Sequence, residues 1–438
     1  MTESFENIFQ IGEALEQRLA NIEDQLDDQI NKIVDLSRVG TVFTSLFNLD
    51  LILPMVIETA LRIVKGEVGE VIIFDRDGEL KSVNWGLSPE ITRKIKTDKG
   101  INVIDHFRNS GEALIINDLH FADENVKNIS KISVNSIIAA PLKSKEKVVG
   151  AIIIANKENQ QEFDGEDKFT LELLGNFAAV AVKNVELHKE ALVKQEIEHE
   201  LKLAEQVQNT LIPDSNETYP GIEVKAYHDQ AGQVGGDFYD ILKLSEGRYL
   251  IVVADVSNKG IPAALIMTSA RSYIRVAAET MTSLPGLAKR VNKLLCNDIQ
   301  RLGGMFVTMF FGLIDFNEQK LYSLNAGHPP CYFYHGKKVE RLKTGGTFIG
   351  QFPDIDFKEA ETEIKSGDRF IVFTDGMFEC VNTRGEMLGL EKLSEFLKKY
   401  NGIPWDKFTE KVKTLLSEYS YDSARVDDTT LIRVEIKN

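Results

Sequence analysis

Cysteine is scarce in this chain, and long apolar runs are missing. The three cysteines, Cys296, Cys331 and Cys380, lie far apart and form no CxxC pair, which argues against a disulfide framework or a thiolate zinc site. No stretch approaches the ~18 consecutive apolar residues of a membrane-spanning helix. The N-terminal segment MTESFENIFQ lacks the basic and apolar regions of a secretion signal. We therefore expect a soluble, cytoplasmic protein that does not associate with membranes.

Positive charge is also in deficit. The 438 residues include 51 Lys and Arg against 67 Asp and Glu, a net charge of -16, which opposes non-specific binding to nucleic acid or anionic lipid. The apolar content of 43% is typical of globular proteins, and a length of about 150 residues per domain predicts two or three domains. We expect partners that are proteins or small ligands.

An apolar stripe at helical spacing runs along residues 1–38, which predicts an amphipathic helix. Its members recur every three or four residues: Ile8, Ile11, Leu15, Leu19, Ile22, Leu26, Ile30 and Ile33. The pattern repeats every 11 residues, unlike an ordinary leucine zipper. Its apolar face needs a partner, either a second copy of the chain in a homodimer or another part of the same chain.

Residues 39–181 read as a mixed α and β domain. A helical segment at 51–64 precedes the strand patterns GEVIIF and ELKSVNW, joined by a turn at 75–78, and a polar turn at 144–147 separates two further strands. The segments SIIAAPLKSKEKVVGAIIIANK and FDGEDKFTLELLGNFAAVAVKNVEL resemble a GAF domain. The resemblance implies a sensory domain that binds a small ligand or acts as a dimerising transducer.

Part of this segment resembles the NKFDE signature of cyclic-nucleotide-binding GAF domains. Asn156, Lys157, Phe163 and Asp167 match four of its letters, but Lys168 stands in the fifth position in place of Glu. We therefore interpret Lys157 and Asp167 as an ion pair that ties a strand end to a helix.

A helical connector is predicted for residues 182–213. The helix opens near Asp164 and contains no proline until Pro213, so it is far longer than the usual 8 to 20 residues. Lys194 and Gln208 interrupt an apolar seam at heptad spacing that consists of Ile197, Leu201, Ala204 and Leu211. The pattern predicts a parallel coiled coil of modest stability, which could exchange between two arrangements.

Acidic residues recur at strand ends in residues 214–438. RYLIVVADVS and DRFIVFTDG are buried-strand patterns that lead to Asp255 and Asp375, DDTTLIRVEI begins with Asp427 and Asp428, and GGDFYD places Asp237 beside two glycines. Carboxylates gathered at buried strand ends repel one another unless a cation compensates them. Because no His or Cys accompanies these motifs, the ligand type favours Mg²⁺ or Mn²⁺ over zinc.

The ordered set GGDFYD, ADVSNKG, FTDGMFECVNTRGE and DDTT, with LAEQVQNTLIP before it and NAGHPPCYFY within it, resembles the SpoIIE/RsbU-type branch of the PPM metal-dependent phosphatases. The resemblance covers residues 203–436 and implies a sandwich of two β-sheets between helices. It also implies two ions, Mn²⁺ or Mg²⁺, held by catalytic carboxylates: Asp237, Asp255, Asp375 and Asp427. The Val256 carbonyl and the neighbouring Asp428 complete the predicted ligand set. Asn258 stands where the family usually has Gly, and Asn tolerates positive φ.

Two adjacent divalent ions would activate water for an in-line displacement that releases serine or threonine. No cysteine begins a CxxxxxR loop, which argues against a cysteine nucleophile, and His328 before Pro329 is more typical of a structural loop residue than of a general acid. The family resemblance further implies a phosphorylated STAS-domain antagonist of an anti-sigma factor as substrate.

The sequence therefore predicts an α+β multidomain phosphatase regulated by a GAF-like sensor, with a PPM-type α-β-β-α sandwich at 214–438. Two other functions remain compatible with it: a catalytically inactive scaffold, and a ligand-sensing binding protein. Loss of the metal-binding acids would favour the scaffold, and none of them is missing.

Overall fold

A computed structural model describes residues 18–19, 30, 34, 37–74, 79–97, 103–118, 134–145, 147–299, 303–336, 338–419 and 427–437. The chain divides into two compact units, residues 1–195 and 196–438, which we describe separately. The predicted N-terminal stripe lies outside the described residues except for Leu19 and Ile30, which are helical and exposed. The predicted turn at 75–78 also lies outside them.

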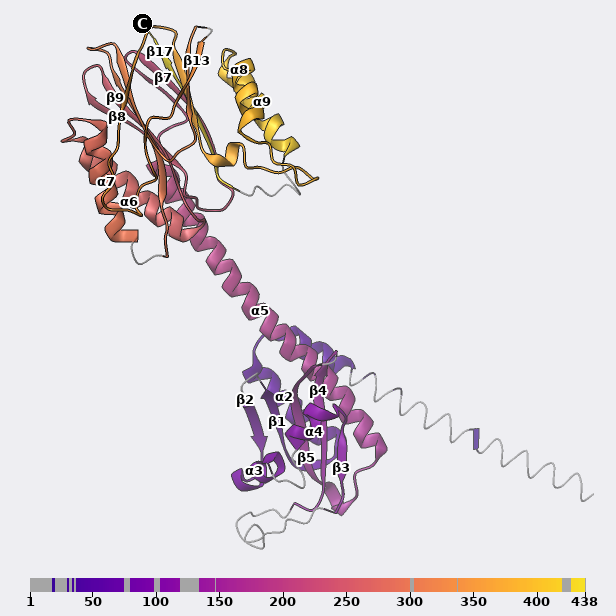
Figure 1. The fold of residues 1–438 in the computed structure, drawn as a ribbon. Helices are drawn as coiled ribbons and strands as arrows, with labels where there is room; N and C mark the ends of the chain where they lie inside the picture. Colours follow the sequence, from indigo (N-terminus) through magenta and orange to yellow (C-terminus); the bar gives the residue numbers. More distant parts are fainter. Residues whose placement is uncertain are drawn as a thin grey trace, which may run out of the picture. The chain divides into compact units, whose positions relative to one another are not determined.

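The first unit is built on a five-stranded antiparallel sheet in the order β2-β1-β5-β4-β3 (Figure 1). One face packs on α2 and the first half of α5, and the opposite face packs on α3 and α4. These elements are α2 (Leu49–Val64), β1 (Gly66–Phe74), β2 (Glu79–Trp85), α3 (Pro89–Thr97), α4 (Val103–Asn109), β3 (Leu114–Ile116), β4 (Ile137–Ser144), β5 (Lys147–Lys157), the 3-10 turn η2 (Glu158–Gln160) and α5 (Gly165–Leu211).

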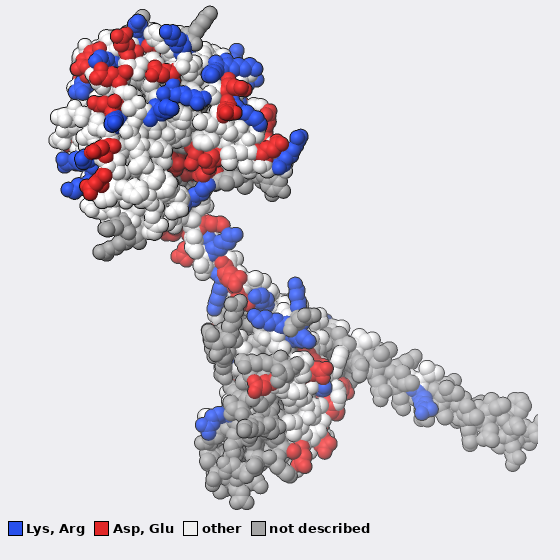
Figure 2. Space-filling model, in the orientation of Figure 1, with Lys and Arg blue, Asp and Glu red and all other residues white. Residues whose placement is uncertain are grey.

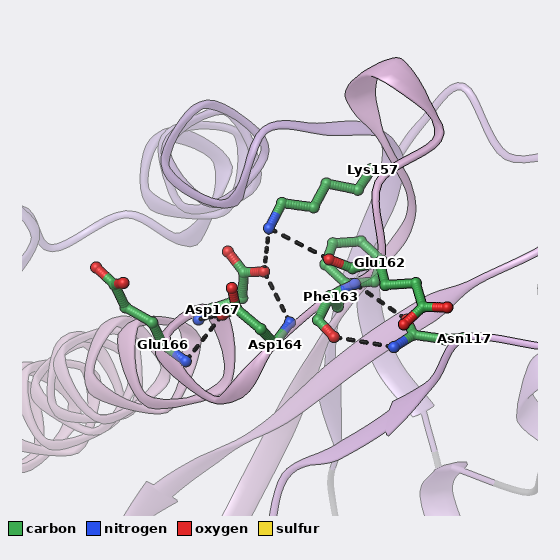
Figure 3. A network of polar contacts seen from close by, with 7 residues as sticks. All are labelled: Asn117, Lys157, Glu162, Phe163, Asp164, Glu166 and Asp167. Atoms are coloured by element: carbon green, nitrogen blue, oxygen red, sulfur yellow. Dashed lines mark hydrogen bonds and ion pairs between the residues drawn. The ribbon is translucent and has the colours of Figure 1, made fainter.

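A reciprocal capping box begins α5 (Figure 3). Asp164 Oδ1 accepts the amide of Asp167 at 3.0 Å, and Asp167 Oδ2 accepts the amide of Asp164 at 3.0 Å. Lys157, at the end of β5, places its Nζ 2.5 Å from the same Asp167 oxygen. Asn117 brackets Phe163 with two backbone hydrogen bonds. The interpretation of Lys157 and Asp167 as an ion pair that ties a strand end to a helix is confirmed.

Two six-stranded sheets form the second unit, in the orders β14-β11-β10-β9-β8, with β15 beside β11, and β13-β12-β16-β17-β7-β6. The strands are β6 (Asn216–Tyr219), β7 (Ile222–Asp229), β8 (Phe238–Ser245), β9 (Arg248–Val256), β10 (Val307–Asp315), β11 (Lys320–Ala326), β12 (Cys331–His335), β13 (Lys338–Leu342), β14 (Gly345–Gly346), β15 (Ala360–Glu363), β16 (Arg369–Phe373) and β17 (Thr429–Ile436). The helices are α6 (Ile261–Ala278), α7 (Leu284–Ile299), the 3-10 turn η3 (Asp375–Met377), α8 (Leu390–Tyr400) and α9 (Trp405–Glu418).

These elements stack in four layers. Apolar residues of both sheets share one core between them, while α6 and α7 cover the outer face of the β8–β11 sheet and α8 and α9 cover the outer face of the other (Figure 1). Alternation along the strands supplies this arrangement, because each strand presents one face to the central core and the other to helices. The predicted α-β-β-α sandwich is confirmed.

The predicted uninterrupted helix is present as α5, which is 47 residues long. No described helix, α5 included, is long and apolar enough to cross a membrane. One prediction about α5 is wrong: Gln208 does not interrupt an exposed seam. It is 4% exposed and hydrogen-bonded to Gly235 within the second unit. Heptad spacing cannot separate a helix face that packs on its own domain from one that meets a partner.

Candidate metal centre

The candidate carboxylates lie where strands begin or end. Asp237 directly precedes β8, and Asp255 is the second-last residue of β9. Asp375 lies two residues after the end of β16, and Asp427 and Asp428 directly precede β17. The start of β8 pairs with the end of β9, and the end of β16 pairs with the start of β17. Hydrogen bonds between the two sheets bring these strand ends to one place.

Two threonine hydroxyls hold Asp237 in the interior. Its Oδ2 accepts hydrogen bonds from Thr374 Oγ1 and Thr430 Oγ1, each at 2.7 Å, and the residue is 1% exposed. Burial raises the pKa of Asp237 well above its ordinary value, and the nearby charge of Asp255 adds to this. We did not predict these threonines from sequence, although they stand next to acids in the FTDG and DDTT motifs.

The charges of the other carboxylates act on one another and change their pKa values. Burial, followed by the charges of Asp375 and Asp427, raises the pKa of Asp255 to about 8. Burial and the charge of Asp427 also raise the pKa of Asp375 to about 6. The structure therefore brings Asp237, Asp255, Asp375 and Asp427 into one cluster whose mutual repulsion a bound cation would relieve.

Asp428 has a distinct position in this cluster. Its Oδ1 accepts the amide of Ala231 and its Oδ2 accepts the amide of Gly236, both at 2.8 Å. Asp428 therefore holds the loop that leads into Asp237. The same loop passes so close to Val256 that a Cβ on Gly236 would lie 2.8 Å from the Val256 carbonyl oxygen. Glycine is required there, since any side chain would crowd this candidate ligand.

The loop between β9 and α6 places a positively charged lysine beside the carboxylates. Lys259 Nζ lies 2.9 Å from Asp427 Oδ2, and its charge partly offsets the rise in the pKa of Asp375. Asn258 has φ +70, a conformation that Asn tolerates better than most residues other than Gly. No local pattern predicts that Lys259 pairs with an acid about 170 residues away, because such a contact depends on the packing of the two sheets.

His328 and the cysteines offer no alternative catalytic groups. His328 is 6% exposed and its Nδ1 lies 2.9 Å from Thr308 Oγ1; burial lowers its pKa to about 3, so the ring is neutral and cannot supply a proton near pH 7. Burial also raises the pKa of Cys331. These observations support the interpretation of His328 as a structural loop residue.

The donor set fits hydrated magnesium or manganese. Carboxylates and the Val256 carbonyl are hard oxygen ligands, and neither His nor Cys accompanies them. Among the described residues, no group of three or more His, Cys, Asp or Glu side chains is arranged around a single point for an ion. Mg²⁺ typically takes only one or two protein carboxylates and keeps several waters, so this arrangement is compatible with it.

Surface charge around the second unit is mixed. In the view of Figure 2, basic and acidic side chains alternate over this unit and no continuous basic stripe crosses the drawn face. The drawn face of this unit therefore carries charges of both signs.

The four-layer sandwich with acids at its strand ends defines a PP2C-like phosphatase fold. It resembles the SiaA-PP2C domain of Pseudomonas aeruginosa with a TM-score of 0.50 and 22% identity, covering 56% of this chain and 100% of that one. Residues 245–437 match the family profile described as Stage II sporulation protein E (SpoIIE), and residues 48–183 match a GAF domain. The two matches fall in the parts of the chain whose sequence motifs resemble a GAF domain and a SpoIIE/RsbU-type phosphatase.

Two curated relatives share parts of the chain. Protein IcfG of Synechocystis sp. is 29% identical over 310 residues, which is 64% of this chain and 47% of the relative. Phosphoserine phosphatase RsbU of Bacillus subtilis is 30% identical over 207 residues, which is 46% of this chain and 61% of the relative. The chain spans about half the length of the curated relatives it matches.

Proposed function

We propose that this chain is a metal-dependent protein-serine/threonine phosphatase whose activity a GAF domain regulates. The observation that carries the proposal is the cluster of Asp237, Asp255, Asp375 and Asp427, which four separate strand ends contribute. The name of the RsbU relative, a phosphoserine phosphatase, supports the same reaction class. The crowding of carboxylates favours a catalytic metal centre over an inactive scaffold, because it is costly without a cation.

In this proposal the four carboxylates and the Val256 carbonyl hold two ions of Mn²⁺ or Mg²⁺. Such ions, when bound, would lower the pKa of a bound water and neutralise charge on the phosphoryl group. Thr374 and Thr430 fix the rotamer of Asp237. Lys259 adds a positive point charge at the rim of the cluster, where it can attract phosphoryl oxygens.

Hydrolysis of phosphoserine should require Mn²⁺ or Mg²⁺ and stop in chelator. We propose a phosphorylated STAS-domain protein as substrate, which the SpoIIE/RsbU resemblance supports. The test compares phosphate release from such a protein and from an unrelated phosphoserine peptide, with Mn²⁺, with Mg²⁺ and with EDTA. Hydrolysis that persists in EDTA would remove the metal mechanism, and equal rates on both substrates would remove the STAS preference. Binding of the STAS protein without hydrolysis would instead support the scaffold function.

A parallel homodimer is the second part of the proposal. Large apolar side chains remain exposed along α5: Leu187, Leu192, Val193, Ile197, Leu203 and Val207. A helix with this much exposed apolar surface gains stability by pairing with a second copy. Sedimentation equilibrium at micromolar concentration should give twice the 49.2 kDa mass of one chain. A monomer at that concentration would contradict the prediction.

Regulation would pass along the connector, residues 182–213, from the GAF domain at 39–181 to the phosphatase domain at 214–438. A cavity of about 660 Å³ in the first unit is lined by bases that include Arg62 and Lys65 and by acids that include Asp164. A small polar ligand of the GAF domain would fit such a mixed lining. The cytoplasmic location expected from the sequence stays a prediction.

A further inference from the structure

The last turns of α5 reach the loop that carries the first metal-binding acid. Gln208 Nε2 donates to the carbonyl oxygen of Gly235 at 2.7 Å, and Gln208 Oε1 accepts the amide of the same residue at 3.1 Å. One buried carboxamide thus satisfies both polar groups of one backbone residue, as a neighbouring β-strand would. Gln230 donates to the same Oε1 at 3.3 Å. The pairing is specific to a side chain of this length and chemistry.

A second contact ties the end of α5 to the other side of Asp237. The hydroxyl of Tyr239 donates to the carbonyl oxygen of Pro213 at 2.7 Å, and Tyr239 is 2% exposed. Burial raises the pKa of Tyr239, so the hydroxyl keeps its proton and remains a donor. Gly235 and Tyr239 stand two residues before and two residues after Asp237. The end of the connector therefore holds the chain on both sides of this acid.

The loop has little freedom to adjust if the Gln208 contact is lost. On its opposite side Asp428 accepts the amide of Gly236, and a Cβ on Gly235 would lie 2.2 Å from Asp428 Oδ2. The loop is thus held between α5 and the start of β17. Removing the carboxamide leaves two buried backbone groups of Gly235 without these partners, and such groups are costly to leave unsatisfied. We expect the loop to shift to recover hydrogen bonds, and Asp237 to shift with it.

We propose that Gln208 is a positioning residue for the metal centre: it holds Gly235 so that Asp237 points into the carboxylate cluster. This inference rests on the proposed function, since it takes Asp237 as a metal ligand. Successive helical residues are about 100° apart around the axis, so a modest rotation of α5 would withdraw Gln208 from Gly235. The geometry of the metal centre therefore depends on the orientation of the connector.

Gln208→Met tests the proposal, because Met has nearly the shape of Gln but cannot make either hydrogen bond. Gln206→Met is the matched control: the same substitution, two positions away, at an exposed residue of the same helix. Calorimetric titration of the full-length protein with Mn²⁺ should show binding weakened by about 10- to 100-fold in Gln208→Met, the range found when partners that orient metal ligands are lost. The control should bind Mn²⁺ as the wild type does. Phosphatase activity of Gln208→Met should recover largely at saturating Mn²⁺.

Thermal unfolding in chelator separates positioning from simple stabilisation. If Gln208→Met unfolds at a lower temperature than the wild type but binds Mn²⁺ with unchanged affinity, Gln208 is only a stabilising residue and the inference is overturned. If the wild type itself binds no Mn²⁺ and hydrolyses nothing, the proposed function has failed and the inference falls with it. Should Gln208→Met not fold, Tyr239→Phe decides: it removes the second contact and should also weaken Mn²⁺ binding, and unchanged binding would overturn the inference.

Discussion

Asp255→Asn and Asp375→Asn should each reduce turnover of a phosphoserine substrate by about a hundredfold or more. Each change keeps the size of the side chain and removes one of the charges that hold and orient the metal ions. A loss of roughly 3 kcal/mol of transition-state stabilisation, which is modest for a damaged metal centre, already corresponds to about two orders of magnitude in rate. Initial rates at fixed Mn²⁺ measure the effect. Undiminished hydrolysis by either variant would remove these residues from the mechanism.

Stability measurements should show the opposite trend for the same variants. Because Asp255 and Asp375 repel neighbouring carboxylates, their replacement by Asn should leave the metal-free protein as stable as the wild type or more stable. The increase in unfolding temperature that Mn²⁺ gives the wild type should, however, shrink or disappear. Asp356→Asn is the control, since Asp356 is exposed and pairs with exposed Lys289. A large loss of stability in chelator would indicate a structural role instead.

Local patterns in the sequence predicted individual helices and strands, while the two-sheet sandwich was predicted from the family resemblance. Strand patterns and helical periodicity predicted α2, the 47-residue α5 and the strands β1, β2, β4, β5, β9, β16 and β17. The Lys157–Asp167 pair was predictable because the two residues are ten positions apart at adjoining element ends. The acids were recognisable because each follows or precedes a buried strand. That they meet required the family resemblance, since periodicity describes one element at a time.

Contacts that orient the acids could not be predicted in the same way. Thr374 and Thr430 reach Asp237 across sequence separations of 137 and 193 residues. Gln208 was likewise misassigned to a coiled-coil seam. It does lie at heptad spacing from the seam residues, but its side chain hydrogen-bonds to the backbone of Gly235, 27 positions along the chain. Which face of an element meets which neighbour is decided by tertiary packing, and a single sequence carries little information on it.

Two arginines of α6 bind a buried carboxylate of the sheet that bears the candidate metal centre. Asp240 on β8 is fully buried, and Arg275 binds it in a bidentate manner, with Nε–Oδ2 and Nη2–Oδ1 distances of 2.7 Å. Arg271, one turn earlier on α6, adds a contact at 3.3 Å. α6 begins directly after the loop that carries Val256 and Lys259. The ion pair therefore helps to fix the position of that loop.

Replacing both arginines by methionine should destabilise the second unit by about 3–5 kcal/mol, because it leaves the Asp240 carboxylate buried without a counter-charge. For a unit of this size the calorimetric midpoint should fall by roughly 6 to 20 °C. Adding Asp240→Leu to Arg271→Met and Arg275→Met should restore much of the loss, because replacing a whole buried ion group by apolar residues is often neutral or better. Lys289→Met, at the exposed pair with Asp356, is the control and should change stability by less than about 1 kcal/mol. If the double arginine variant unfolds at the wild-type temperature, the Asp240 carboxylate is hydrated or protonated in that variant without a large loss of stability. The ion pair then does not hold α6 in place.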